Sequence, residues 1–264
     1  VNNYVCFGSN VTPCPTDNLY RIIGVFGDQV KLIKYDYATS TLLGADGDYS
    51  QAYTATWNDS SFTSKYIGNN LANIAGYTWN YKNNPSINYG SGSNEWSTSL
   101  FNKTNLNTNY LNKIGTTWSN LIEDTTWKVS GHTTSSVRPK VMYTAEITNA
   151  TKTYGTENGT SKIGLMYVSD YGFAAAPSAW TSDMNSYSSS LITSVNWMYM
   201  GLIEWTITPN SSNSGYVFYL GTDGNLATFY ANSKCGARPV LYLKDSVAYA
   251  GGSGTKDSPI TLVV

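Results

Sequence analysis

Residues 21–37, RIIGVFGDQVKLIKYDY, carry the clearest structural signal in the chain. Two runs rich in β-branched and aliphatic residues, 22–26 and 30–33, flank a Gly-Asp pair. A pair of this kind between two strand-like runs is typical of a tight turn in a β-hairpin. We therefore expect an antiparallel hairpin here and build the rest of the fold outward from it.

Further strand-like runs follow toward the C-terminus, separated by turns rich in Asn, Gly and Ser. They are TWKV (126–129), VMYTAEI (141–147), KIGLMYVS (162–169), EWTIT (204–208), GYVFYLG (215–221), NLATFY (225–230) and RPVLYL (238–243). Residues 45–94 show no sustained period and are rich in Gly, Asn, Ser and Tyr, which predicts long ordered loops. The aromatic residues expected to hold these loops in place are Trp57, Tyr66, Tyr77, Trp79 and Tyr89.

Two short helices are expected between the loops and the later strands. Thr104 could cap the start of the first helix and Gly115 its end. The apolar residues at helical spacing are Leu106, Tyr110, Leu111 and Ile114 for the first helix, and Trp118, Leu121 and Ile122 for the second. The predicted fold class is thus α+β, rich in β, with long irregular loops and a few short helices.

Domain organisation follows from uniform composition. No compositional shift marks a linker and no period marks an internal repeat, so we expect one domain over residues 1–264. The final stretch 251–264, GGSGTKDSPITLVV, is a Gly-Ser turn followed by a short apolar run, and it predicts either a closing strand or a tether.

Composition narrows the possible partners. Only 12% of residues are charged, whereas the chain has 22 Tyr and 8 Trp, so its surface must be built from Asn, Ser, Thr, Gly and Tyr, which suit neutral partners. A net charge of -1 argues against nucleic acid, whose binding needs a basic patch. No apolar run approaches the roughly 20 residues that span a bilayer. We expect a mature or excised ectodomain, extracellular or at the cell surface, with any anchor outside the given chain.

The three cysteines differ in their surroundings. Cys6 and Cys14 lie in VCFGSNVTPCP, a short polar loop in which a disulfide would close a small ring. Cys235, beside Gly236, is expected to be a small core residue. His132 is the only histidine and no CxxC spacing exists, so we expect no metal site and no cofactor.

Catalytic chemistries find little support in the residue pattern. A glycoside hydrolase would need a carboxylate pair, for which Glu123-Asp124 and Glu146 are the places to look, but nothing nearby predicts a raised pKa. We expect these carboxylates to be solvated or to stabilise turns. A Ser-His-Asp hydrolase would have to use His132, with no nucleophile elbow in the sequence. Asp46 and Asp48 in GADGDYS resemble part of a Ca²⁺ loop, but a turn stabilised by aspartate side chains is favoured.

Four stretches together resemble a family of uncharacterised surface proteins of gut Firmicutes and related bacteria. They are NNYVCFG (2–8) with LYRIIGVF (19–26), KIGLMYVSDYGFAAAP (162–177), NWMYMGLIEWTITP (196–209) and GARPVLYLKDSVAYAGGSGTKDSPITL (236–262). The last stretch also resembles the end of C-type-lectin-like domains of the formylglycine-generating-enzyme type, which include retroelement-diversified variable proteins. In those domains a Gly-x-Arg-Pro segment leads into the final core strand.

The resemblance implies a C-type-lectin-like fold in which the first and last strands pair, so that RIIGVF would lie beside RPVLYL. It also implies that a ligand meets the stretch before the last strand, here roughly 197–234. Within that stretch we expect Trp197 and Trp205 to be core residues rather than a binding platform. The residues expected at the ligand are Tyr219, Asn225, Tyr230 and Asn232. Arg238 is expected to tie down loop carbonyl groups.

The chain departs from the enzymes of that type where their chemistry resides. Those enzymes use two cysteines shortly before the final strand, and here Cys235 stands alone. The resemblance therefore implies the scaffold without the activity. Three functions stay open: a non-catalytic adhesin-like or receptor-like domain that binds a glycan or a protein, a pilin-like or surface-array subunit, and a carboxylate-dependent glycoside hydrolase. The first is preferred, and whether 197–234 varies among relatives is a further hypothesis.

Overall fold

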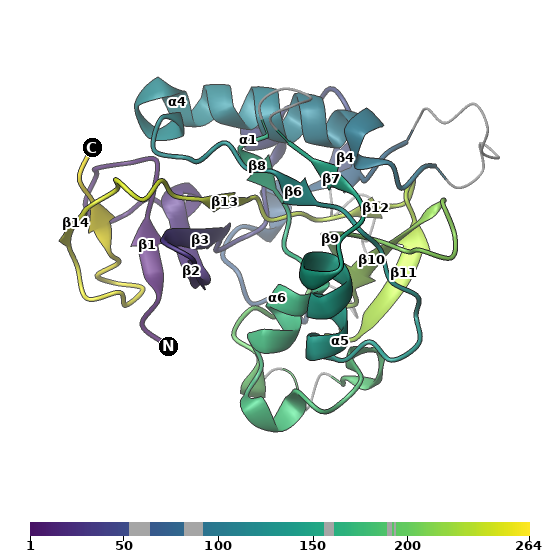
Figure 1. Cartoon of the computed structure of the whole chain (residues 1–264). Helices are drawn as coiled ribbons and strands as arrows, with labels where there is room; N and C mark the ends of the chain where they lie inside the picture. The colour runs from purple at the N-terminus through teal and green to yellow at the C-terminus, as the bar shows by residue number, and fades with distance from the viewer. Residues whose placement is uncertain (53–63, 82–91, 156–160, 189–191, 193) are drawn as a thin grey trace.

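Small antiparallel sheets and short helices make up the computed structural model, which describes residues 1–52, 64–81, 92–155, 161–188, 192 and 194–264. The expected α+β class is confirmed at this level (Figure 1). The described strands are β1 (Tyr4–Cys6), β2 (Leu19–Phe26), β3 (Gln29–Lys34), β4 (Tyr49–Ala52), β5 (Ala75–Thr78), β6 (Trp127–Lys128), β7 (Thr153–Tyr154), β8 (Ile163–Gly164), β9 (Glu204–Pro209), β10 (Tyr216–Leu220), β11 (Leu226–Tyr230), β12 (Lys234–Cys235), β13 (Val240–Tyr242), β14 (Tyr249–Gly251) and β15 (Thr261–Leu262).

The helices are mostly one or two turns long. The α-helices are α1 (Ser40–Leu43), α4 (Leu111–Ser119), α5 (Pro139–Tyr143) and α6 (Val168–Phe173). The 3₁₀ turns are η1 (Thr16–Asn18), η2 (Leu71–Asn73), η3 (Trp96–Thr98), η7 (Pro177–Ala179) and η8 (Met184–Ser186), and the π-helical segments are η4 (Phe101–Tyr110) and η5 (Thr144–Thr148). No helix in the described ranges is long and apolar enough to cross a membrane.

The predicted hairpin is confirmed as β2 and β3. Phe26 pairs with Gln29 across the Gly-Asp turn, and Gly27 adopts a φ of +65°, which few residues other than glycine accept. Both faces of β3 are covered, so Leu32 and Ile33 are both fully buried. Strand β3 is therefore central to the fold, whereas the turn end of the hairpin is exposed, with Val25 65% exposed.

The five-stranded sheet has the order β1-β2-β3-β13-β8. The expectation that RIIGVF lies beside RPVLYL is wrong, because β13 pairs with β3, with Val240 opposite Ile33. One edge of β2 is taken by β3 and the other by β1, where Tyr4 pairs with Arg21. The free edge of β3 is therefore where β13 can add to the sheet.

The two ends of the chain do meet, through other strands. The amide of Cys6 donates to the carbonyl of Ile260 at 2.8 Å, and the amide of Ile260 donates to that of Tyr4 at 2.8 Å. Strands β14 and β15 pair antiparallel. Residues 251–264 thus form a closing segment against β1, and both termini lie on the same side of the molecule (Figure 1).

Residues 141–147, predicted as a strand, form α5 and η5 instead. Pro139 stands at the first helical position, where its fixed φ suits a helix and its missing N–H costs nothing. Met142 and Glu146, four residues apart, are both fully buried, which places them on one helical face. The β-branched residues of VMYTAEI suggested a strand, but helical packing decides the structure. Residues 162–169 likewise change from β8 to the start of α6.

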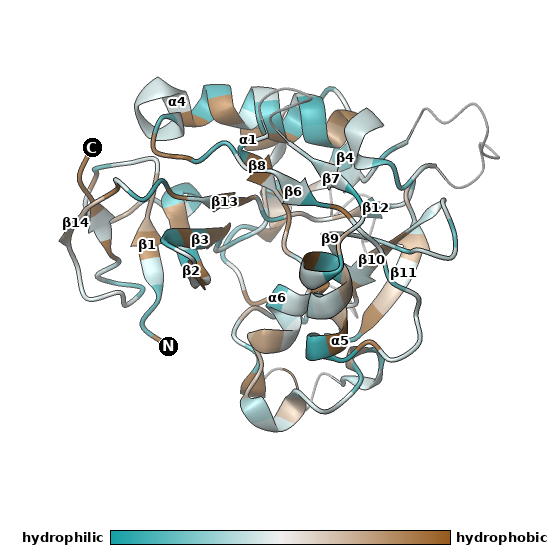
Figure 2. Cartoon of the chain, in the orientation of Figure 1, coloured by the Kyte–Doolittle hydropathy of each residue, from teal (hydrophilic) through white to brown (hydrophobic). Residues whose placement is uncertain are grey.

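The predicted helix around Leu106 begins earlier and ends later than expected. Helical structure runs from Phe101 through η4 into α4, so Thr104 is not its cap. Gly115 interrupts it with a φ of 79°, and the helix then continues to Ser119. Brown and teal bands alternate along this helix in Figure 2, as expected for an element with one face on the core.

The loop region 45–94 contains more regular structure than predicted, because β4 and β5 pair within it. Tyr77 and Trp79 are fully buried and hold the region as expected. The hydroxyl of Tyr66 donates to the carboxylate of Asp36. Trp57 and Tyr89 lie outside the described residues.

Candidate functional site

The four residues expected at the ligand lie around strands β10 and β11, but they do not share one face. Tyr216 is opposite Tyr230 and Tyr219 is opposite Ala227. Because directly opposed residues share a face and neighbours along a strand alternate, Tyr219 and Tyr230 lie on opposite faces of the ribbon. Tyr230 is exposed, whereas the Tyr219 ring lies 5.2 Å from that of Phe229 and is half-buried.

The two asparagines are also apart. Asn225 lies in the turn between β10 and β11, where its carbonyl accepts the amide of Gly221 at 2.8 Å. Asn232 lines a hollow of about 440 Å³ together with Asp48 and Tyr81. A ligand role for these four residues stays a prediction.

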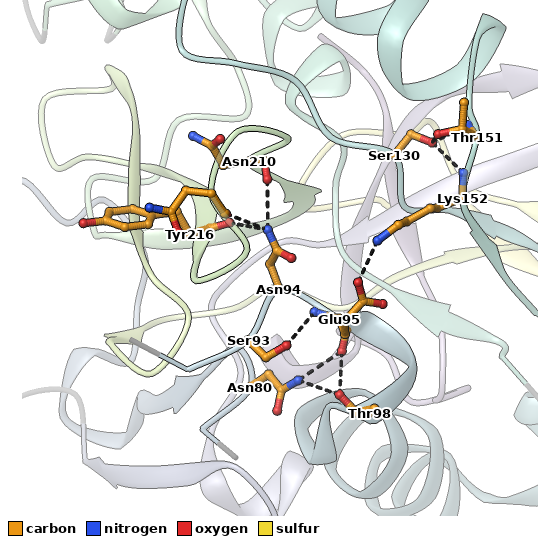
Figure 3. A network of polar contacts seen from close by, with 11 residues as sticks. Asn80, Ser93, Asn94, Glu95, Thr98, Ser130, Thr151, Lys152, Asn210 and Tyr216 are labelled. Atoms are coloured by element: carbon orange, nitrogen blue, oxygen red, sulfur yellow. Dashed lines mark hydrogen bonds and ion pairs between the residues drawn. The ribbon is translucent and has the colours of Figure 1, made fainter. Parts of the chain in front are cut away.

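The loop that leads into this ribbon is held by a polar network (Figure 3). The side-chain amide of Asn94 donates to the carbonyls of Asn210, Asn213 and Tyr216 at 2.9, 3.0 and 3.0 Å. Glu95, the next residue, pairs with Lys152 at 2.6 Å. Asn94, which lies 116 residues before Asn210 in the chain, thus holds residues 210–216 in place. The backbone carbonyls of these residues therefore make hydrogen bonds that stabilise the loop.

A second hollow lies elsewhere, between the β2–β3 hairpin and helix α6. It is a cleft of about 550 Å³. Its walls combine aromatic rings with hydroxyl, amide and charged groups. The lining residues are Ile23, Phe26, Gly27, Gln29, Lys31, Glu123, Asp124, Thr125, Thr126, Lys128, Tyr143, Ile147, Tyr167, Ser169, Asp170, Phe173, Ala174, Trp197 and Tyr242. Apolar and aromatic walls with a few polar groups are typical of small-molecule sites.

A buried ion pair lies at the base of the cleft. Lys31 Nζ, from β3, is 2.6 Å from Asp170 Oδ2, from α6, and the side chains are 1% and 6% exposed. The same Asp170 oxygen accepts the amide of Tyr167 at 2.8 Å and so caps the start of α6. Burial by itself would lower the pKa of the Lys31 ammonium, but Asp170 and the hydroxyl of Tyr242 outweigh it and raise that pKa.

Aromatic rings surround the ammonium of Lys31. Its Nζ lies 4.4 Å from the centre of the Tyr167 ring, with further rings between 5.3 and 6.0 Å away. These further rings belong to Phe26, Trp127 and Tyr242. Ring faces stabilise a cation and also exclude water from it.

Glu146 lies against the first turn of α6, and its surroundings differ from the solvated or turn-stabilising role expected from the sequence. It is fully buried, and its carboxylate accepts the amides of Val168 and Ser169, both at 3.0 Å, and the hydroxyl of Thr208. Burial raises the pKa of Glu146 to about 7, although these hydrogen bonds oppose the shift. The sequence had suggested a solvated or turn-stabilising carboxylate because the helical burial of 144–148 was not visible in it.

The rim of the cleft carries exposed aromatic side chains. Tyr143 and Phe173 are 37% and 39% exposed, with ring centres 6.3 Å apart. Trp180, 38% exposed, is not part of the cleft lining but extends the apolar surface beyond Phe173, with ring centres 5.2 Å apart. On the hairpin side, Phe26 is 38% exposed. These rings, from separate elements, make an apolar border that the sequence pattern did not indicate.

Other candidate residues have structural partners. Asp48 is buried, and its carboxylate accepts the amide of Phe101 at 2.8 Å and that of Tyr81 at 3.2 Å, so it joins distant segments and the expected stabilisation of its own turn is not what these contacts show. His132 Nδ1 lies 2.7 Å from the carbonyl of Thr133. Within the described residues, no group of three or more His, Cys, Asp or Glu side chains could hold a metal ion.

The cysteines match their predictions. Cys6 and Cys14 form a disulfide. Cys235 is buried in the core, and burial raises the pKa of its thiol. Trp205 is fully buried as expected, whereas Trp197 is half-buried and lines the cleft.

Comparisons with protein-family models, curated proteins and solved structures give no match to this chain. The site is therefore defined by its own geometry. Local patterns could not locate the cleft, because its walls come from segments between Ile23 and Tyr242. One sequence signal could have indicated part of it: Lys31 lies within the apolar run of the hairpin, and a lysine on a buried strand is seldom left without an acidic partner.

Proposed function

We propose that the chain is a non-catalytic ligand-binding domain of a secreted or cell-surface bacterial protein, and that it binds a glycan in the cleft between the β2–β3 hairpin and α6. The observation that carries the proposal is the cleft itself, of about 550 Å³, with exposed rings on its rim and polar side chains within. Aromatic rings can stack on the apolar faces of sugars, while hydroxyl and amide groups hydrogen-bond sugar hydroxyls.

An extracellular location is supported by the Cys6–Cys14 disulfide, because disulfides persist mainly in oxidising compartments. A C-type-lectin-like scaffold is supported by the meeting of the chain ends at Val5 and Ile260 and by the place of β13 inside the main sheet. Long loops between these elements are in keeping with such a scaffold. Within this proposal the chain belongs with the surface proteins that its sequence resembles.

Hydrolysis is less well supported than binding, although Glu123 and Asp124 line the cleft. Asp170 is held by Lys31, and Asp124 lies 3.3 Å from Lys162 Nζ. Glu146, the carboxyl group with a pKa of about 7, is enclosed behind α6 and makes its contacts with the protein. A glycosidase needs two carboxyl groups that face each other across the bond to be cleaved.

Glycan-array screening followed by calorimetric titration tests the proposal. We expect a bound glycan, and we expect Phe173→Ala or Tyr143→Ala to weaken its binding about tenfold, as for aromatic contacts at other interfaces. Tyr230→Ala is the matched control, because it changes the β10–β11 ribbon that the sequence predicted to meet the ligand; if the ligand binds in the cleft instead, this variant leaves the affinity unchanged. Loss of binding in the control alone would move the site to the ribbon. Absence of any glycan ligand would overturn the proposal.

A further inference from the structure

The Lys31–Asp170 pair has the features of a covalent cross-link site. A primary amine and a carboxyl group lie at 2.6 Å, both almost fully buried, on elements 139 residues apart in the chain. Asp170 Oδ2 is bonded directly to the carboxyl carbon, so Nζ also lies close to Cγ. Groups held within hydrogen-bond contact in this way are close to the geometry in which reacting atoms, roughly 3–3.5 Å apart, are positioned to react.

We propose that Lys31 Nζ and Asp170 Cγ join in an intramolecular amide bond, formed by the folded chain itself. The amide ties β3 of the main sheet to the first turn of α6. It is a modification of the protein's own side chains and needs no added reagent.

The reaction balances within the pair. The ammonium of Lys31 passes one proton to the carboxylate of Asp170, which gives a neutral amine and a neutral acid. The amine lone pair attacks Cγ, and the N–C bond forms. The acid's hydroxyl group then leaves with a second proton from the nitrogen, as water. Of the three ammonium protons, two leave in the water and one stays on the amide.

Before the reaction the ammonium of Lys31 is the favoured form, because Asp170 and Tyr242 raise its pKa; the gain that condensation brings is the removal of both buried charges. Two opposite charges buried among rings carry a desolvation cost, and forming a neutral amide removes both charges. The rings of Tyr167, Trp127 and Tyr242 keep bulk water from the reacting atoms. Hydrolysis, the reverse reaction, is hindered by the same exclusion. The titratable groups that face the pair are Tyr167, Tyr242 and Glu146.

Other close pairs in the described chain lack one of these features. Lys152 is also 2.6 Å from a carboxylate, Glu95, but the two side chains are 59% and 40% exposed. Arg238 and Glu204 are as buried as Lys31 and Asp170, yet a guanidinium is a poor nucleophile. Lys34 is buried but 3.6 Å from Asp17, which is 48% exposed. The combination of amine, distance and burial singles out Lys31 and Asp170 among these pairs.

The intact mass of the whole purified chain tests the proposal. We expect it to fall below the sequence mass by one water, after allowance for the hydrogen lost in the disulfide. Tryptic digestion should yield a branched peptide that joins Lys31 to Asp170, with no cleavage after Lys31. A Lys31→Arg variant keeps a cation but cannot form the stable amide, so its mass should match its sequence.

The exposed Lys152–Glu95 pair is the internal control and should give unlinked peptides. A wild-type mass equal to the sequence mass after prolonged incubation of the folded protein, with cleavage after Lys31, would overturn the proposal. So would a lost water in Lys31→Arg. Neither result depends on ligand binding. The proposed function can therefore fail while the cross-link is confirmed, and the cross-link can fail while ligand binding is confirmed.

Discussion

The guanidinium of Arg238 forms a bidentate ion pair with the carboxylate of Glu204 inside the core. Nε lies 2.7 Å from Oε1 and Nη2 lies 2.8 Å from Oε2, and Nη2 also donates to the carbonyl of Met198 at 2.7 Å. The last contact confirms the expectation that Arg238 ties down a loop carbonyl. Burial raises the pKa of Glu204, and Arg238 opposes that shift. The pair joins the start of β9 to the approach to β13.

Arg238→Ala should lower the free energy of unfolding by about 3–5 kcal/mol, because it leaves the Glu204 charge buried without a partner. The loss should shrink as the pH falls, since protonation neutralises Glu204. Urea denaturation at neutral and acidic pH measures both effects. The double variant Arg238→Met with Glu204→Gln is the matched control and should lose less. A loss that stays the same at all pH values would contradict this account.

Glu146 should make the folded state less stable as the pH rises. Below pH 4.5, its ordinary pKa, the carboxyl is protonated in both states and contributes no difference. Between pH 4.5 and about 7 the unfolded chain ionises while the folded one stays protonated, so stability falls, and above that window the loss is constant. The full loss is about 3 kcal/mol for a shift of this size.

Glu146→Gln tests this prediction, because an amide cannot ionise. Gln also presents an N–H₂ group to one of the amides that Glu146 accepts, so the variant should be less stable overall. The wild type should lose stability relative to the variant between pH 4.5 and about pH 7, as measured by urea denaturation. Parallel pH profiles for the two proteins would contradict the prediction.

Asn94→Asp should make residues 210–216 more mobile, because these residues lose the hydrogen bonds from the Asn94 side chain. The substitution keeps the size of the side chain but replaces its donors with an acceptor that faces three carbonyl groups. We expect a loss of about 1–3 kcal/mol and faster hydrogen exchange of the amides between β9 and β10. Exchange in the β2–β3 hairpin is the internal control and should not change. Unaltered exchange at 210–216 would show that other contacts hold this loop.

Cys14→Ser should cost roughly 2 kcal/mol, because the disulfide closes a small ring and restricts the unfolded chain. The cysteines are 8 residues apart, so the entropic effect is at the lower end for disulfides. Urea denaturation of the variant and of the reduced wild type should show the same loss. An unchanged free energy in both would mean that the strands around β1 are held by their hydrogen bonds alone.

Local features of the sequence predicted the hairpin, the disulfide and several buried residues. The Gly-Asp turn and its flanking runs contain within 17 residues all that a hairpin needs. By contrast, 141–147 formed helices because Met142 and Glu146 pack into the core, a contact that strand propensity does not report. Burial of Glu146 also set its pKa, which the neighbouring residues in sequence could not indicate.

The sequence alone determined the turn chemistry, the alternation of β2 and β3, the Cys6–Cys14 ring and the scarcity of charge, because each depends on residues close together or on composition. Only the tertiary structure decided that β13 adds beside β3 and that Lys31 meets Asp170 at 2.6 Å. Those contacts join residues far apart in the chain. They depend on which strand edge stays free and which faces become covered, and a folded arrangement of the whole chain is needed to settle both.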